Sequence, residues 1–356
     1  MKGRAVWLDT LPDGRRLAAL TVDGQIEDIL ADPPDAWGPA QPGAIFRARM
    51  GRPMKGMGGA MVDLGDGLTG FLRETKGLSP GAAVLVQVGA VSESAKAPPV
   101  SRRLLFKGRN AILTPGSPGI NVSRAVRDEG ARARLQSAGQ AAMAGADPDF
   151  GLILRSAAGA AENADIEGEI AELRALAEAM LADATGAPEL LLDAPDAHLA
   201  AWRDWADPAP ELVDDAPGAF ERGGIWDALR AVLSPEIPLG GGAWMTVEPT
   251  RALVAIDVNT GADTSPAAGL KANVAALRAL PRALRLRGLA GQITVDPAPF
   301  SKRERPQLEQ VLNRAMREDA GEMLLAGWTP LGHMEMQRKR DRHPLAKVLK
   351  DALPDL

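Results

Sequence analysis

The sequence predicts an α/β protein of several domains, with a small β-barrel near its start and a unit of parallel strands near its end. Between residues 43 and 91, glycines and prolines separate short strand-like runs. Between residues 251 and 296, a strand, a helix and a second strand follow one another. With 356 residues, 46% of them hydrophobic, the chain is long enough for two or three domains.

The first element is a small β unit over residues 1–41. It holds short apolar runs and an Asp-Gly turn at Asp23-Gly24, and it ends in the proline-rich stretch DPPDAWGPAQPG. These features indicate short strands, a turn and then a linker.

The second element is a barrel of the OB type. AIFRARM alternates apolar and basic residues, and the following strand-like runs are rich in glycine, which permits sharply coiled strands. Phe46 and Phe71 are expected on one face, where aromatic and basic side chains together suit single-stranded nucleic acid. The nearby basic residues are Arg47, Arg49, Arg52 and Lys55. Alternatively, the two phenylalanines belong to the core.

The third element combines strands and helices over residues 109–185. A helix of about 163–183 carries one apolar face, formed by Ile166, Ile170, Leu173, Leu176 and Met180. Before it, the strand of FGLILRSAAG ends in Arg155-Ser156, which can present a guanidinium and a hydroxyl to a phosphate. The same motif also fits a plain surface arginine.

The fourth element delivers carboxylates from two strands. The apolar strand of RALVAIDVNTG ends on Asp257, with Asn259 two residues later, and GQITVDPAPF ends its strand on Asp296. A helix of about 267–287 joins them, so we expect parallel strands whose carboxyl ends share one sheet edge. Two adjacent carboxylates suit Mg²⁺, which supports phosphoryl-transfer chemistry. Alternatively, each aspartate caps the segment that follows it.

Composition excludes several kinds of site. The absence of cysteine removes disulfides, cysteine-bound zinc, iron–sulfur clusters and thiol nucleophiles. With only three histidines, a histidine-rich metal site is not expected. The chain starts without a signal-like apolar run and has no uninterrupted apolar stretch of about 20 residues, so we expect a cytoplasmic protein.

Charge falls into three blocks. Residues 1–138 hold 19 Lys/Arg against 13 Asp/Glu, residues 139–249 hold 5 against 21, and residues 250–356 hold 17 against 12. The net charge of −5 therefore conceals two basic ends and an acidic middle. This distribution permits a nucleic-acid partner without requiring one.

Several stretches together resemble the ribonuclease E/G family, nearly from end to end. GGGAWMTVEPTRALVAIDVNTG and LKANVAALRALPRALRLRGLAGQITVD resemble its catalytic core. GAIFRARM and GGAMVDLGDGLTGFL resemble its S-one-type RNA-binding OB-fold, and LTPGSPGINVSRAVRDEGARARL with GLILRSAAGAA resembles its 5′-end sensor. Further matching stretches are APELLLDAP, FERGGIWDALRAVLSPEIPL and LGHMEMQRKRDRHPL.

The resemblance implies a particular domain order. A split ribonuclease H-like unit (1–41 and 186–238) would be interrupted by the OB-fold barrel (42–108) and by a 5′-sensor domain (109–185). A deoxyribonuclease I-like α/β catalytic domain (239–356) would follow.

The resemblance also implies a Mg²⁺-dependent endoribonuclease, with Mn²⁺ as an alternative ion, that cuts single-stranded RNA to leave 5′-phosphate and 3′-hydroxyl ends. Asp257 and Asp296 would hold the metal, and Asn259 would orient the scissile phosphate or a metal-bound water. Arg155 and Ser156 would read a 5′-monophosphate. The other RNA-binding residues would be Phe71, Lys96, Arg124, Arg338 and Arg340.

The chain departs from the family pattern at several points. The cysteines that link protomers through zinc are absent, as is the small domain beyond them, so we expect no zinc and either a monomer or a dimer formed without zinc. Met61 replaces a common phenylalanine on the barrel, and Ala125 replaces a sensor arginine. Ser156 keeps the hydroxyl of a usual threonine, whereas Pro299 replaces a common aspartate. Pro281 is expected to kink the linking helix.

Three functions stay open. The intact Asp257, Asn259 and Asp296 favour the nuclease. Met61, Ala125 and the missing zinc link favour a non-catalytic or weakly active RNA-binding relative. A Mg²⁺ phosphatase acting on small molecules would explain the carboxylates but neither the glycine-rich barrel nor the basic ends.

Overall fold

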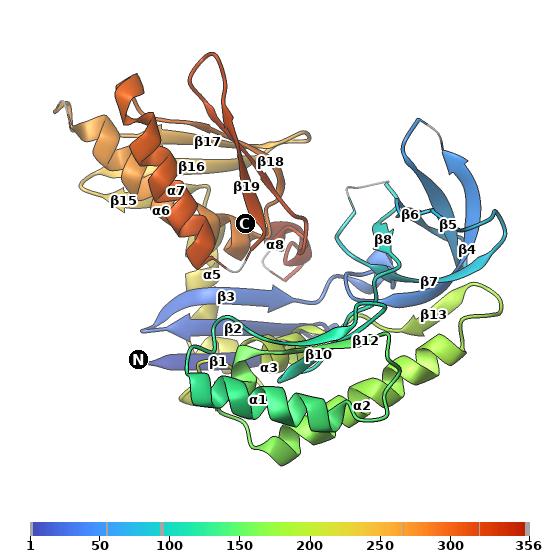
Figure 1. Ribbon diagram of the computed structural model, residues 1–356. Helices are drawn as coiled ribbons and strands as arrows, with labels where there is room; N and C mark the ends of the chain where they lie inside the picture. Colours follow the sequence, from blue (N-terminus) through green and yellow to red (C-terminus); the bar gives the residue numbers. More distant parts are fainter. Residues whose placement is uncertain (1–2, 55, 93–95, 266, 320, 353–356) are drawn as a thin grey trace. The chain divides into compact units, whose positions relative to one another are not determined.

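The computed structural model describes residues 3–54, 56–92, 96–265, 267–319 and 321–352, and over these ranges it is a mixed α/β protein with four sheets (Figure 1). The chain forms two compact units. The N-terminal unit comprises the residues up to Ala18 together with Leu30–Asp215, and the C-terminal unit comprises Ala19–Ile29 together with the chain from Ala216 onward. Among the described residues, no helix has the length and apolarity that crossing a membrane requires.

The first three strands join a fourth in the order β14-β1-β2-β3. Their bounds are β1 Arg4–Thr10, β2 Arg16–Val22, β3 Gln25–Ala31 and β14 Leu212–Asp214. Asp23 and Gly24 connect β2 to β3 with φ values of 50° and 80°, as a tight hairpin turn requires. The predicted turn is therefore confirmed.

A five-strand barrel follows, as predicted. Its strands are β4 Ile45–Met54, β5 Gly59–Gly65, β6 Leu68–Leu72, β7 Ala83–Val88 and β8 Pro99–Ser101. The ring closes because β4 pairs with both β5 and β7, and β13 (Glu189–Leu192) adds antiparallel to β4. Gly70 permits the tight coiling, since a Cβ atom there would lie 2.9 Å from the Val100 side chain.

The third sheet has the order β11-β12-β10-β9. Its strands are β9 Phe106–Lys107, β10 Ala111–Pro115, β11 Gly119–Val122 and β12 Phe150–Leu154, and its helices are α1 Glu129–Ala142 and α2 Asn163–Ala182. The helix expected over about 163–183 is thus confirmed. Ile166 and Ile170 are fully buried in the shared core, and the other three residues of the predicted apolar face pack against that core.

The C-terminal unit contains a six-stranded sheet in the order β15-β16-β17-β18-β20-β19. Its strands are β15 Glu236–Gly240, β16 Ala243–Pro249, β17 Val254–Asn259, β18 Gly291–Asp296, β19 Met323–Trp328 and β20 Met334–Arg338. The helices α6 (Ala268–Arg287) and α7 (Arg305–Glu318) supply most of the apolar side chains packed against one face of this sheet. Helix α6 continues through Pro281 as one helix.

Shorter helices complete the described chain. They are η1 Asp35–Trp37, η2 Ser156–Gly159, α3 Ala197–Asp204, α4 Ala219–Arg222, α5 Ile225–Leu233, η3 Lys302–Glu304 and α8 Leu345–Val348.

A buried arginine near the end of α6 holds several parts of the C-terminal unit together. Arg285 donates through Nε to Asp319 (2.7 Å), through Nη1 to the carbonyl of Glu27 (2.7 Å) and through Nη2 to the Glu27 carboxylate (2.9 Å). It also lies 3.1 Å from Asp28. Asp28 and Asp319 are themselves buried, so their charges depend on this guanidinium for compensation.

The replacement of Arg285 by leucine is expected to lower the free energy of unfolding by about 3–5 kcal/mol, because two buried carboxylates lose a partner. Burial alone would raise the pKa of Asp28, but Arg342 and Arg285 outweigh it and bring the pKa below its ordinary 3.8. This stabilisation is therefore present above about pH 4 and is lost as the pH falls further. Urea unfolding at pH 7 and at pH 3 measures both effects.

The matched control is Arg314→Leu on the neighbouring helix α7, outside the ion cluster. Arg314 pairs with Glu318 at 2.9 Å, but both side chains are exposed (76% and 65%), so its removal should cost less than about 1 kcal/mol. Equal losses for the two variants would contradict the role given to Arg285.

His343 supplies a second pH-dependent contribution to stability. Burial lowers the pKa of His343 from 6.5 to about 4. Between these values the unfolded chain binds the proton that the folded chain does not, so stability should fall as the pH drops from 6.5 to 4. The slope from this one group is at most about 1.4 kcal/mol per pH unit. Unfolding of wild type and His343→Gln across this range should show a shallower dependence in the variant, and parallel curves would refute the assignment.

Candidate active site

The two strand-end aspartates are register partners. β17 and β18 run parallel, and Asp257 lies directly beside Asp296 in the pairing. Both residues are exposed, whereas Ile256 and Val295, which precede them, are buried. Because side chains alternate along a strand, the carboxylates lie on the face opposite the apolar core, at the carboxyl edge of the sheet.

Asn259 belongs to the same group. It lies two residues after Asp257 on β17, and its Nδ2 donates to Asp257 Oδ2 at 2.7 Å. One carboxylate oxygen of Asp257 therefore has a fixed partner, which orients the group, and the other oxygen is left to bind a ligand.

The segment after Asp296 is held in place by α6. Asn273, which is buried in the helix, donates to the carbonyl of Ala298 and accepts from its amide, both at 2.9 Å. Gly269 lets the backbone pass closely, since a Cβ atom there would overlap the carbonyl oxygen of Pro299. The backbone of Pro299 thus packs directly against α6.

His333 lies beside Asp296, and no local pattern in the sequence predicts this position. Its Nε2 is 3.6 Å from Asp296 Oδ1. The residue sits in the turn between β19 and β20, where its amide donates to Thr329 Oγ1 at 3.1 Å and its carbonyl accepts from the Thr329 amide at 2.8 Å. Only the antiparallel pairing of β18 with β20 brings it to Asp296.

Thr246 is a second neighbour that sequence reasoning missed. It lies opposite Asp257 in the antiparallel pair β16–β17, so Thr246, Asp257 and Asp296 form one row across three strands. Side chains directly opposite each other in a sheet share a face. The row therefore places a hydroxyl next to the carboxylate pair.

These donors fit a hard divalent cation. Within the described ranges, no group of three or more His, Cys, Asp or Glu side chains is arranged to hold a metal ion. The edge offers two exposed carboxylates, and an ion held there would keep several water molecules. Mg²⁺ is typically held in this way, by one or two carboxylates.

The barrel aromatics separate into two roles. Phe46 is 1% exposed and belongs to the barrel core, so the core alternative is confirmed for it. Phe71 is half-buried, its ring lies 2.7 Å from where a Cβ of Gly59 would stand, and its register partner across β5–β6 is Met61. Phe71 thus remains the aromatic available on that face.

The basic residues of the barrel also differ in exposure. Arg47 is 6% exposed and pairs with Asp183 at 2.5 Å and with Glu189, so its expected place on an RNA-binding face is wrong. Arg49 and Lys96 are exposed. Lys55 lies outside the described residues.

The residues predicted to read a 5′-phosphate lie at one edge of the third sheet. β11 and β12 are parallel, and the Ser123 amide donates to the Leu154 carbonyl at 2.8 Å, so the turn that carries Arg124 lies beside Arg155-Ser156. Arg124 is exposed and Ser156 is half-buried at the start of η2.

Arg155 already has protein partners. Its Nη2 donates to Asp204 at 2.7 Å, and its Nη1 donates to the Gly108 carbonyl at 2.7 Å. Despite burial, the hydrogen bond and charge of Arg203 and the charge of Arg155 bring the pKa of Asp204 below its ordinary value. A phosphate at this edge would therefore compete with Asp204 for the guanidinium.

Two arginines, Arg338 on β20 and Arg340 after it, were expected to contact RNA. The prediction for Arg338 is wrong. Arg338 is 2% exposed and pairs with Asp319 at 3.2 Å, so it is a buried structural residue and not a surface contact. Arg340 is half-buried and packs over Gly291. The sequence pattern does not distinguish the buried Arg338 from the half-buried Arg340, because arginines are mostly exposed in proteins.

Comparison with known proteins identifies one family model and several similar proteins. The family model described as the ribonuclease E/G family matches residues 106–215 and 209–341. Ribonuclease E of Nostoc sp. is 28% identical over 97% of this chain and 57% of its own length. Ribonuclease E of Synechocystis sp. is 27% identical over 97% of this chain and 58% of its own length. Ribonuclease G of Escherichia coli (strain K12) is 24% identical over 88% of this chain and 75% of its own length.

The chain therefore spans less than two thirds of the two ribonuclease E sequences. The family match nevertheless covers well over half of the chain and includes both strand-end aspartates. On this basis, the chain belongs to the ribonuclease E/G family.

Proposed function

We propose that the protein is a Mg²⁺-dependent endoribonuclease that cuts single-stranded RNA by attack of water, leaving 5′-phosphate and 3′-hydroxyl ends. The observation that carries the proposal is the register pairing of Asp257 with Asp296 at an exposed sheet edge. Membership of the ribonuclease E/G family supports the choice of RNA as the substrate.

Each residue at the edge has a distinct task in this proposal. Asp257 and Asp296 would hold the cation, and Asn259 would keep Asp257 oriented through the 2.7 Å hydrogen bond. A bound Mg²⁺ polarises the phosphate and lowers the pKa of a coordinated water. His333 would hold the Asp296 carboxylate from the opposite side, at the 3.6 Å separation of the two groups.

The N-terminal unit would supply further contacts to the RNA. Phe71 would stack on a base, and the exposed Lys96 and Arg124 would contact phosphates. Arg155 and Ser156 would receive a 5′-monophosphate, for which Arg155 must leave Asp204. Arg340 would contribute a further basic contact in the C-terminal unit.

A weakly catalytic RNA-binding relative is the second candidate. Two observations favour it. Met61 lies opposite Phe71, where a second aromatic side chain would complete a clamp, and the guanidinium of Arg155 is already bound to Asp204. Both features lower RNA affinity without touching the carboxylate pair. A cleavage assay therefore separates the two candidates.

Asp257→Asn and Asp296→Asn should each reduce cleavage at least about 100-fold, because each removes a charge that holds the cation. The assay uses a short 5′-monophosphorylated, A/U-rich single-stranded RNA with Mg²⁺, and it scores 5′-phosphate on the products. EDTA should abolish cutting while leaving the RNA bound.

The matched control is Asp263→Asn. Asp263 is an exposed carboxylate in the loop after β17 that accepts from the Ser265 amide at 2.8 Å, and its loss should leave the cleavage rate near that of wild type. Binding of the RNA without any cutting by the wild type would establish the weakly catalytic candidate instead.

Phe71→Ala should weaken RNA binding by about 1–3 kcal/mol, the usual contribution of one base–aromatic stack. Met61→Phe should strengthen binding, because the new ring would face Phe71 across the strand pair. Fluorescence anisotropy in EDTA measures both, with the exposed Trp37→Ala as a control aromatic elsewhere in the same unit. Unchanged RNA affinity in Phe71→Ala and Met61→Phe would show that this face of the barrel does not bind the RNA.

A further inference from the structure

A cation at the start of α7 lies near the sheet edge at which β18 ends, on the face that α6 and α7 cover. Arg305 begins α7, and its guanidinium carbon lies 4.8 Å from the centre of the Trp328 ring. Phe300 packs on the same tryptophan, with ring centres 5.4 Å apart. The side chain is thus held by aromatic contacts, as a cation–π pair allows.

The neighbouring carboxylates are occupied by other donors. Glu309 accepts from the Trp328 indole at 2.6 Å, and Glu304 accepts from the Ser301 amide at 2.7 Å. Among the residues that the structure describes, Arg305 forms no ion pair, and its buried Nε has no hydrogen-bond partner. Arg285 and Arg342 in the same unit are paired with acids, whereas, within the described chain, the buried Arg287 donates only to backbone carbonyls.

The turn between β19 and β20 lies between Arg305 and Asp296. A Cβ atom on Gly332 would lie 3.8 Å from an Arg305 Nη atom, and Gly332 directly precedes His333, whose ring is 3.6 Å from Asp296. Trp328 pairs with Met334, which pairs with Val295, so Trp328 is two strands from β18. At the spacing of strands in a sheet, this is roughly 10 Å.

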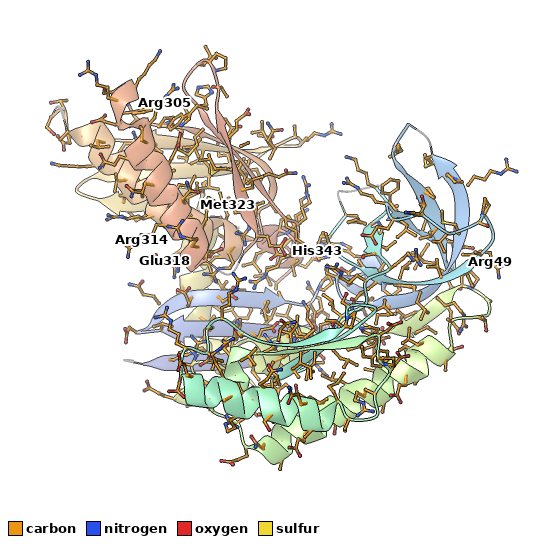
Figure 2. The ribbon with its side chains drawn as sticks, in the orientation of Figure 1. Arg49, Arg305, Arg314, Glu318, Met323 and His343 are labelled. Carbon is orange, nitrogen blue, oxygen red and sulfur yellow. The ribbon has the colours of Figure 1, made fainter. Side chains whose placement is uncertain are left out.

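Figure 2 shows the two ends of α7, with Arg305 at one end and Arg314 and Glu318 toward the other. The end that carries Arg305 is the one that follows β18 and Asp296 in the chain. The helix therefore begins at the carboxylate edge, and its unpaired arginine lies at that end.

We propose that Arg305, held against Trp328, binds a backbone phosphate of the RNA next to the one being cut. The inference rests on the proposed function for the choice of ligand. A guanidinium without an acidic partner matches a phosphodiester in charge and in hydrogen-bond donors. This contact would fix the direction in which the strand crosses the carboxylate edge.

Salt-dependent binding tests the inference without cleavage. The dissociation constant of a short single-stranded RNA is measured by fluorescence anisotropy in EDTA over a series of KCl concentrations, using the full chain. Loss of one phosphate contact should lower the log–log salt slope by about 0.7. Arg305→Gln should show this decrease together with about tenfold weaker binding.

Two further variants make the test specific. Arg305→Lys keeps the charge and should restore most of the slope, even if the loss of the planar group alters the fold locally. Arg314→Gln removes an exposed arginine from the same helix and should leave the slope unchanged. A wild-type slope in Arg305→Gln would overturn the inference.

A parallel titration replaces chloride with inorganic phosphate at equal ionic strength. Phosphate binding that depends on Arg305, combined with an RNA slope that does not, would assign the position to a small anion and overturn the RNA contact. A lowered RNA slope supports the inference whether or not the wild type cuts RNA. An unchanged slope defeats it even in an active nuclease, so the two proposals fail separately.

Discussion

The parallel register of β17 and β18 is the constraint on which the active edge depends. Asp257 and Asp296 are far apart in the chain, and only the crossover through α6 brings them side by side. A slip of one residue in this pairing would turn one carboxylate toward the apolar core. The alternation of buried Ile256 and Val295 with exposed aspartates makes that slip costly, so the core residues determine the geometry of the site.

The helix between these strands has to satisfy two sets of contacts. Its apolar residues pack on the sheet, while Arg285 binds Glu27 from β3 and Asp319 beyond α7. The buried arginine therefore connects α6 to β3 and to the segment that follows α7. Replacement of a whole buried cluster of this kind by apolar residues is often neutral or stabilising, whereas removal of one partner alone is costly.

The sequence allowed the carboxylate pair to be predicted because strand, helix and strand follow one another, and a right-handed crossover then leaves one arrangement. The barrel and the apolar face of α2 were predictable for similar reasons, from glycine spacing and helical periodicity. His333 and Thr246 were missed because antiparallel neighbours bring them in from other strands, and nothing local marks them. Arg47 and Arg338 were misjudged because burial of an arginine depends on distant acids, namely Asp183, Glu189 and Asp319.

The close approach of Gly269 to Pro299 has a mechanical consequence. Gly269 lies in the first turn of α6, shortly after the loop that follows Asp257, whereas Pro299 lies in the loop that follows Asp296. Together with the two hydrogen bonds between the Asn273 side chain and the Ala298 backbone, this contact joins the start of α6 to the segment that follows Asp296. The segment after Asp296 is thereby fixed to the helix that follows Asp257, which should keep the spacing of the two carboxylates constant when the surrounding loops move.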